Sequence, residues 1–138
     1  MEYQIDKDAL LARVEEEVSH IADASYADTG QSLYDTIVIT EKDRAWVSRL
    51  IQSAIRTLTV RVFQLCTRVD DRLLFFVPDF DETMTDAVTD ELTNFFVYQP
   101  VAVICQSRKA ERAQEYANRA QEAIDKAAIL LHSRKHPE

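Results

Sequence analysis

The three histidines of this 138-residue chain lie near its two ends, and two local patterns place them at spacings that metal sites use. Glu17 and His20 form an E-x-x-H pattern, which puts a carboxylate and an imidazole on one helix face, as in di-iron sites of helical bundles. Such a site needs a second copy of the pattern, and the sequence contains none. His132 and His136 are four residues apart, but they lie beside Pro137 at the end of the chain. We therefore predict no metal site and no cofactor.

An apolar run followed by two aspartates is the pattern most similar to an enzyme motif. Leu73–Val77 precede Pro78, and Asp79, Asp81 and Thr83 then have D-x-D-x-T spacing. This spacing resembles the nucleophile motif of haloacid-dehalogenase-like phosphatases, in which one aspartate attacks phosphorus, the other is acid and base, and magnesium neutralises charge. Pro78 ends the strand directly before the nucleophile position, and too few residues follow to form the required parallel sheet. We interpret the pattern as a turn in which Asp81 caps a helix, and we expect no enzyme activity.

The composition disfavours several other classes. Gly30 is the only glycine, so the glycine-rich loops that bring a backbone close to phosphate cannot be built. Cys66 and Cys105 lie in apolar surroundings without C-x-x-C spacing, which indicates reduced thiols in the core. The longest apolar runs have five residues, far fewer than the roughly 20 that span a bilayer. Residues 1–8 are acidic and lack a signal-peptide core, so we expect an intracellular protein.

The formal charge of −8 is unevenly distributed along the chain. Residues 1–45 carry −7, residues 46–65 carry +3 without any acidic residue, residues 66–104 carry −6, and residues 105–138 carry +2. An acidic chain of this kind disfavours general binding to nucleic acid. The alternation either reflects pairing between helix faces inside one subunit or makes the subunit self-complementary. In the second case copies stack head to tail, as in rings and helical assemblies.

Apolar periodicity predicts a mainly α fold, a four-helix domain with a small two-stranded β element. The predicted helices cover residues 6–26, 41–66, 82–98 and 108–133. Asp6, Thr40 with Asp43, Asp81 and Ser107 are the candidate N-caps. The broad apolar face of the second helix predicts a central position in the fold. The predicted strands are residues 36–40 and 72–77, which we expect to pair with each other.

Three details of this organisation bear on function. Pro100 leaves residues 99–105 open between a continued helix and a short strand. Residues 1–138 are predicted as a single helical domain, with loop or strand excursions at 27–39 and 66–81 and a tail at 134–138. Phe95, Phe96 and Tyr98 form an aromatic cluster that we assign to the core. The candidate interface consists of cations on the last helix and residues of the acidic turn: Arg108, Lys109, Arg112, Arg119, Asp79, Phe80 and Asp81.

The order of these parts resembles that of the small head–tail connector, or head-completion, proteins of tailed bacteriophages and prophages. The resemblance covers roughly residues 32–137. It is based first on Ser32–Asp35, on the acid-capped helix from Thr40, and on the strand and acidic turn 72–81. It continues in Asn94–Phe96, the alanine-rich helix around Glu115–Ala117 and the Arg-Lys-His-Pro ending.

This resemblance implies a structural role in the virion, assembled in the host cytoplasm. Proteins of that family form a ring beneath the portal, usually with twelvefold symmetry, and extend the DNA channel. The implied partners are further copies of the chain, the portal, and tail or neck proteins. DNA passes through without sequence-specific binding, and a negative channel lining repels it. The alternative function is a small cytoplasmic helical module for protein interaction or regulation.

Overall fold

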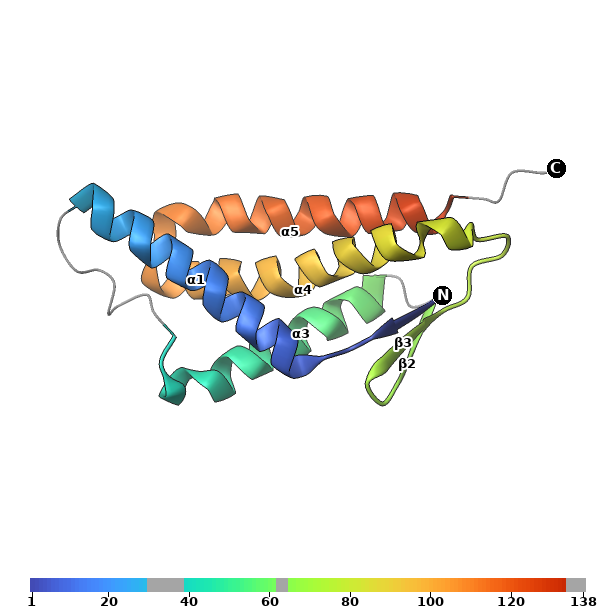
Figure 1. Ribbon diagram of the computed structural model, residues 1–138, viewed down its shortest axis with the longest axis horizontal. Coiled ribbons are helices and arrows are strands. Elements are labelled where there is room, and N and C mark those ends of the chain that lie inside the picture. Colours follow the sequence, from blue (N-terminus) through green and yellow to red (C-terminus); the bar gives the residue numbers. More distant parts are fainter. Residues whose placement is uncertain (30–38, 62–64, 134–138) are drawn as a thin grey trace.

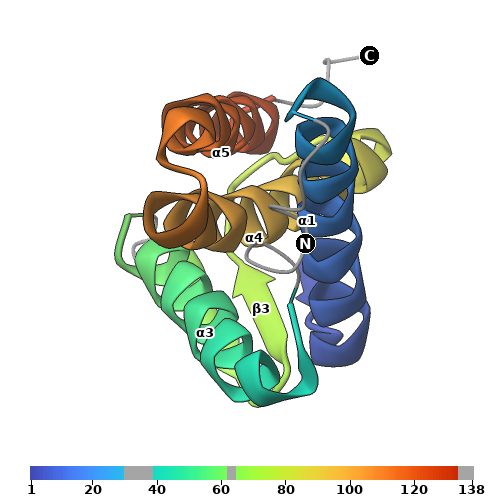
Figure 2. The ribbon, with the colours of Figure 1, turned by 90° about the vertical axis from the view of Figure 1, so that its left-hand side faces the viewer.

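The computed structural model describes residues 1–29, 39–61 and 65–133 (Figure 1). Within these ranges the fold is mainly α, as predicted, and its small sheet has three strands rather than two. The helices are α1 (Lys7–Thr29), α3 (Arg44–Arg61), α4 (Thr85–Arg108) and α5 (Ala110–Leu131). Figure 2 shows α4 in the middle, with α5 on one side and α1 and α3 on the other. The central position predicted for residues 41–66 is therefore wrong, because α4 occupies it.

Helix α1 begins as predicted. The Ala9 amide donates a hydrogen bond to Asp6 Oδ1 at 3.1 Å, which satisfies one of the free donors of the first turn. The apolar stripe that defines its inner face is fully buried: Leu10, Val14, Val18 and Ile21. The helix extends to Thr29, so the first residues of the connector predicted at 27–39 are helical. Residues 30–38, which include most of the candidate strand 36–40, lie outside the described residues.

The capping box predicted before the second helix is confirmed. The Thr40 amide and Thr40 Oγ1 lie 3.0 and 3.1 Å from the Asp43 carboxylate, and a short 3₁₀ turn, η1 (Glu41–Asp43), leads into α3. The predicted end at residue 66 is wrong, since α3 ends at Arg61 and Cys66 begins a strand. Pairing of Cys66 with Phe75 overrides the helical periodicity there.

Three short antiparallel strands form the sheet: β1 (Glu2–Gln4), β2 (Cys66–Val69) and β3 (Arg72–Phe75). Their order is β1-β3-β2, so β3 is paired on both edges, with β1 and with β2. Most of the strand at 36–40 that was expected to pair with residues 72–77 lies outside the described residues. The predicted turn at Asp70 and Asp71 joins β2 to β3, and Asp70 has the positive φ of 54° that a tight turn requires.

Helix α4 continues through Pro100, which resolves the alternatives for residues 99–105 in favour of helix. Pro100 itself is buried, and the apolar face continues past it at Val101 and Ile104. The prediction that Ser107 caps the last helix is wrong, because α4 includes Ser107 and ends at Arg108. Lys109 alone connects the two helices: its amide donates to the Cys105 carbonyl at 2.7 Å while its own carbonyl accepts from Arg112.

The core lies around α4, which contacts α1, α3 and α5. Phe95 and Phe96 are buried there, as predicted, with their rings packed edge to face at 5.8 Å, and Tyr98 is partly buried. The sheet covers one end of this core, where the Tyr3 ring meets Phe96 edge on at 5.4 Å. Among the described residues, no helix has a segment long and apolar enough to cross a membrane.

Candidate functional site

The D-x-D-x-T segment is a capped turn. Asp81 Oδ1 accepts hydrogen bonds from the Thr83 amide at 3.0 Å and from Thr83 Oγ1 at 2.6 Å, at the start of η2 (Glu82–Met84). The predicted capping role of Asp81 is therefore confirmed. Asp79 lies in the preceding turn with a φ of 58°. The preceding strand, β3, has antiparallel neighbours on both edges, unlike the parallel strand that precedes the phosphatase motif.

The histidine and cysteine residues do not converge. His20 is exposed and lies 3.8 Å from Glu16, whereas Glu17 accepts a hydrogen bond from the Tyr116 hydroxyl at 3.4 Å. His132 is exposed, and His136 lies outside the described residues. Among the described residues, no group of three or more His, Cys, Asp or Glu side chains could hold a metal ion.

Cys66 and Cys105 are free thiols in the core, as predicted. Burial raises the pKa of each thiol to about 11, because the charged thiolate is poorly solvated in apolar surroundings. Both side chains are therefore protonated at neutral pH.

Two of the predicted interface cations, Arg112 and Arg119, share one carboxylate. Each donates to Glu115 at 2.7 Å, and the two guanidinium groups lie 5.8 and 4.8 Å from the centre of the Tyr116 ring. We call Arg112, Glu115, Tyr116 and Arg119 the Tyr116 cluster. Burial, and secondarily the charge of Glu17, raises the pKa of Tyr116, so its hydroxyl remains a hydrogen-bond donor. The positive charges of Arg112 and Arg119 are thus paired with a carboxylate of the same subunit.

The remaining predicted interface residues do not form one surface. Arg108 donates to Asp43 at 2.9 Å, and Lys109 pairs with Glu111 at 3.0 Å. Phe80 is 9% exposed and belongs to the core. Figure 1 places the turn between α4 and α5 at one end of the molecule and the loop that contains Asp79, Phe80 and Asp81 at the other. The structure therefore divides the predicted interface into two distant regions.

Further exposed charges that form no ion pair with a described residue lie on α3 and around the start of α4. Arg49 and Arg56 are exposed, seven residues apart on one face of α3, and neither forms an ion pair or hydrogen bond with a described residue. We call these two residues the α3 basic stripe. Glu82 of η2, which accepts a hydrogen bond from Thr85 at 3.3 Å, and Asp86 and Asp90 of the first turns of α4 are exposed and form no ion pair with any described residue. We call these three the α4 acidic stripe.

The two stripes lie on different sides of the molecule. Figure 2 shows α3 at the lower left and the first turns of α4, in olive, at the upper right behind α1. The charge counts already singled out these segments, since residues 46–65 contain arginines and no acidic residue. The particular residues were missed because the sequence does not show which charges are neutralised after folding.

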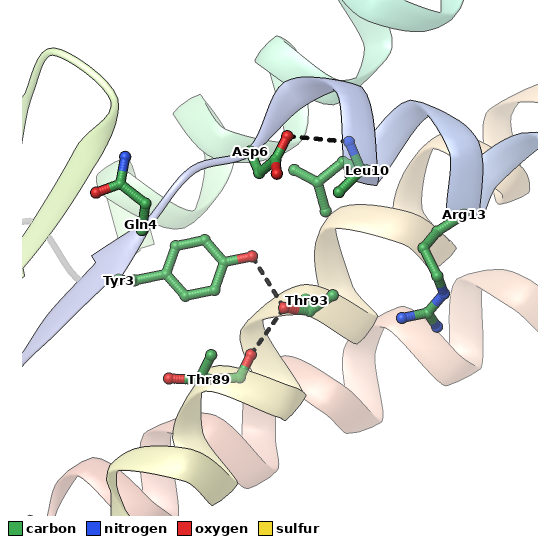
Figure 3. Close-up of a pocket in the computed structure, with 8 residues that line it drawn as sticks. Tyr3, Gln4, Asp6, Leu10, Arg13, Thr89 and Thr93 are labelled. Carbon is green, nitrogen blue, oxygen red and sulfur yellow. Dashed lines mark hydrogen bonds between the residues drawn. The ribbon is translucent and has the colours of Figure 1, made fainter.

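A cleft of about 300 Å³ lies where β1 and the start of α1 meet α4 (Figure 3). The Tyr3 hydroxyl is 2.9 Å from Thr93 Oγ1, which donates to the Thr89 carbonyl at 2.9 Å. Burial raises the pKa of Tyr3, although the bond to Thr93 opposes the shift. Leu10 contributes apolar surface, and Arg13 projects from α1 at the end of the cleft far from Tyr3.

No protein-family model, curated protein or solved structure matches this chain significantly.

Proposed function

We propose that this protein is a virion structural protein at the head–tail junction of a tailed bacteriophage. Copies form a ring beneath the portal and extend the DNA channel. The order of sequence elements from Ser32 onwards supports this proposal, and so does the mainly helical fold. The observation that carries it is the presence of two opposite charge stripes on different sides of one subunit, each without an ion-pair partner among the described residues.

Opposite charges on different faces favour head-to-tail contact between copies. The α3 basic stripe of one subunit approaches the α4 acidic stripe of the next, and each copy leaves one stripe of each sign available. Such heterologous contacts propagate until the rotation closes them into a ring. Contact between like stripes is unfavourable, so charge also selects the orientation.

The net charge of −8 supports the passage of DNA. Contact between the two arginines of one stripe and the three acidic residues of the other leaves the net charge of each subunit at −8, so the assembled ring remains strongly acidic. An acidic channel repels phosphate groups, which prevents DNA from adhering and lets it slide. The portal and the tail or neck proteins then bind the two faces of the ring.

The direct test is the mass and shape of the purified protein. We expect closed rings by negative-stain electron microscopy, and a mass that corresponds to many subunits by light scattering. Arg56→Glu should weaken assembly strongly, whereas Lys126→Glu should not, although it makes the same charge change at an exposed residue of α5. Combining Arg56→Glu with Asp86→Lys should restore assembly.

A monomer at every concentration, with or without the portal protein, would contradict this proposal. That result would favour the helical interaction module instead. Equal effects of Arg56→Glu and Lys126→Glu would show that assembly responds to total charge and not to the stripes.

A further inference from the structure

Phe76 is an exposed aromatic side chain held by buried neighbours. It is 64% exposed, whereas Phe75 before it and Phe80 after it are 3% and 9% exposed. The Phe76 amide donates to the Leu65 carbonyl at 2.7 Å. The loop is thus anchored on both sides of the ring, which projects from a fixed position. An aromatic side chain held in this way loses little conformational entropy on binding and is typical of interface anchors.

The backbone at Phe76 is connected to the region that follows α3, the helix that contains the α3 basic stripe. Leu65, to which it is bonded, follows the end of α3 closely in the chain, and β2 is tied to α3 by Arg68 Nη1, which donates to Gln52 Oε1 at 3.1 Å. The backbone at Phe76 is thus joined through Leu65 and β2 to the part of the molecule that contains the end of α3.

The cleft lies beside the α4 acidic stripe. Thr89 and Thr93 of its wall are neighbours of Asp86 and Asp90 on the same turns of α4. Its volume of about 300 Å³ is at the lower end of the range for ligand sites, which allows one aromatic side chain to enter. The hydroxyls of Tyr3 and Thr93 bond to each other, so an apolar ring does not leave them without partners.

Arg13 of the cleft and Asp79 of the loop have opposite charges, although the cleft wall also includes the carboxylate of Asp6. Arg13 is partly buried at one end of the cleft and forms no ion pair or hydrogen bond with a described residue. Asp79 is exposed three residues after Phe76, and it too forms no ion pair or hydrogen bond with a described residue. The Phe76 ring and the Asp79 carboxylate of the loop thus match the apolar surface of the cleft and the Arg13 guanidinium at its end.

We propose that the Phe76 ring of one copy enters the cleft of the next copy, and that its Asp79 pairs with Arg13 there. The inference rests on the proposed function, because the occupant is a second copy of this chain. It adds an apolar anchor to the contact between the two stripes. The contact is heterologous, with the loop on one subunit and the cleft on the other.

Two variants block opposite sides of this contact. Phe76→Ser removes the ring, and Ala9→Trp fills the cleft from an exposed position of α1. Each should raise the concentration for half-assembly about 10- to 100-fold, the range expected for losing a buried aromatic side chain. Ile129→Ser is the control for the loss of an exposed apolar side chain, because Ile129 is 70% exposed on α5 and belongs neither to the Phe76 loop nor to the lining of the cleft. Circular dichroism checks that each variant is folded.

Mixing the two variants gives the sharpest readout. Phe76→Ser keeps an intact cleft and Ala9→Trp keeps an intact loop, so their mixture should form 1:1 dimers that grow no further. Sedimentation velocity should detect this dimer in the mixture and in neither variant alone. The double exchange Arg13→Asp with Asp79→Arg should likewise assemble better than either single exchange.

The possible results distinguish an error in this contact from an error in the proposed ring. Wild-type assembly that Phe76→Ser and Ala9→Trp leave unchanged would overturn the anchor and leave the proposed function intact. A mixture that forms no dimer would also overturn it. If the dimer forms but wild-type protein grows into open filaments, the anchor is correct and the ring is wrong.

Discussion

Arg108, in the last turn of α4, donates a hydrogen bond to the Asp43 carboxylate at the start of α3, with 2.9 Å between Nη2 and Oδ1. The other oxygen of the same carboxylate accepts from the Thr40 amide at 3.0 Å. The Asp43 side chain thus caps the start of the helix that leads into α3 and also links this helix to α4. The Arg108 guanidinium also lies 5.3 Å from the centre of the Trp46 ring, which shields the pair from water.

Removal of this carboxylate should destabilise the protein. Asp43→Ala loses both the cap and the partner of Arg108, and we expect the free energy of unfolding to fall by about 1–3 kcal/mol. Urea unfolding followed by circular dichroism measures the change. Arg108→Ala and the double variant complete a double-mutant cycle, which should give a coupling energy of at least about 0.5 kcal/mol. Additive effects would show that the contact contributes no net stability.

The same carboxylate should make stability depend on acid pH. Hydrogen bonds from Arg108, and then from Thr40, lower the pKa of Asp43 from its ordinary value of 3.8 to about 2. A lowered pKa in the folded state stabilises the protein above pH 4, and this stability is lost as the pH falls from about 4 to 2. We expect a contribution of about 1 kcal/mol, since the side chain is 21% exposed and solvent screens the pair. Asp43→Asn should flatten the pH profile there, and an unchanged profile would contradict the assignment.

Local signals in the sequence predicted the starts of α1 and α3. Caps at Asp6 and Thr40 need only residues within one turn, so short-range patterns define them. Strand β1 was missed because its alternation is short: only Tyr3 and Ile5 are buried between exposed neighbours. Its formation depends on β3, which is about 70 residues distant in the chain. Long-range pairing of this kind leaves little trace in local composition.

For the same reason the sequence does not show which of the candidate interface residues form contacts inside the subunit. Arg112 and Arg119 lie on a polar helix face, which the spacing predicts, but their shared carboxylate and the Tyr116 ring become visible only after folding. Arg49 and Arg56 look equivalent to them in the sequence, and yet they have no ion-pair partner among the described residues. Tertiary contacts decide which exposed charges remain available.

Both thiols should be inert in the folded protein. Burial raises the pKa of Cys66 and Cys105 to about 11, so only about 0.1% of each thiol is ionised at pH 8. We expect a thiol reagent such as dithionitrobenzoate to react at the rate of unfolding, and to modify both residues within seconds in urea. Fast modification of either residue without denaturant would contradict the buried positions. Cys66→Ser and Cys105→Ser identify which thiol reacts.

The Tyr116 cluster should stabilise the protein more than an exposed ion pair does. Glu115→Gln leaves two guanidinium groups without their carboxylate, and we expect it to lower the free energy of unfolding by about 1–2 kcal/mol. Glu122→Gln is the matched control on the same helix, since its ion pair with Lys126, 2.9 Å apart, is exposed and should contribute little to stability. Chemical denaturation of both variants tests the difference, and equal losses would show that the cluster is an ordinary surface feature.

The salt dependence of assembly should identify the force that joins the subunits. The screening length falls from about 10 Å at 0.1 M salt to about 3 Å at 1 M. If the net charge of −8 dominated, added salt would screen repulsion between copies and promote assembly. The α3 basic stripe and the α4 acidic stripe attract each other instead, and salt weakens this attraction. We therefore expect added salt to raise the concentration for half-assembly. Light scattering across this range distinguishes the two, and Asp90→Asn should reduce the slope because it removes one attractive charge from the stripe. Assembly that strengthens with salt would show that the stripes do not meet.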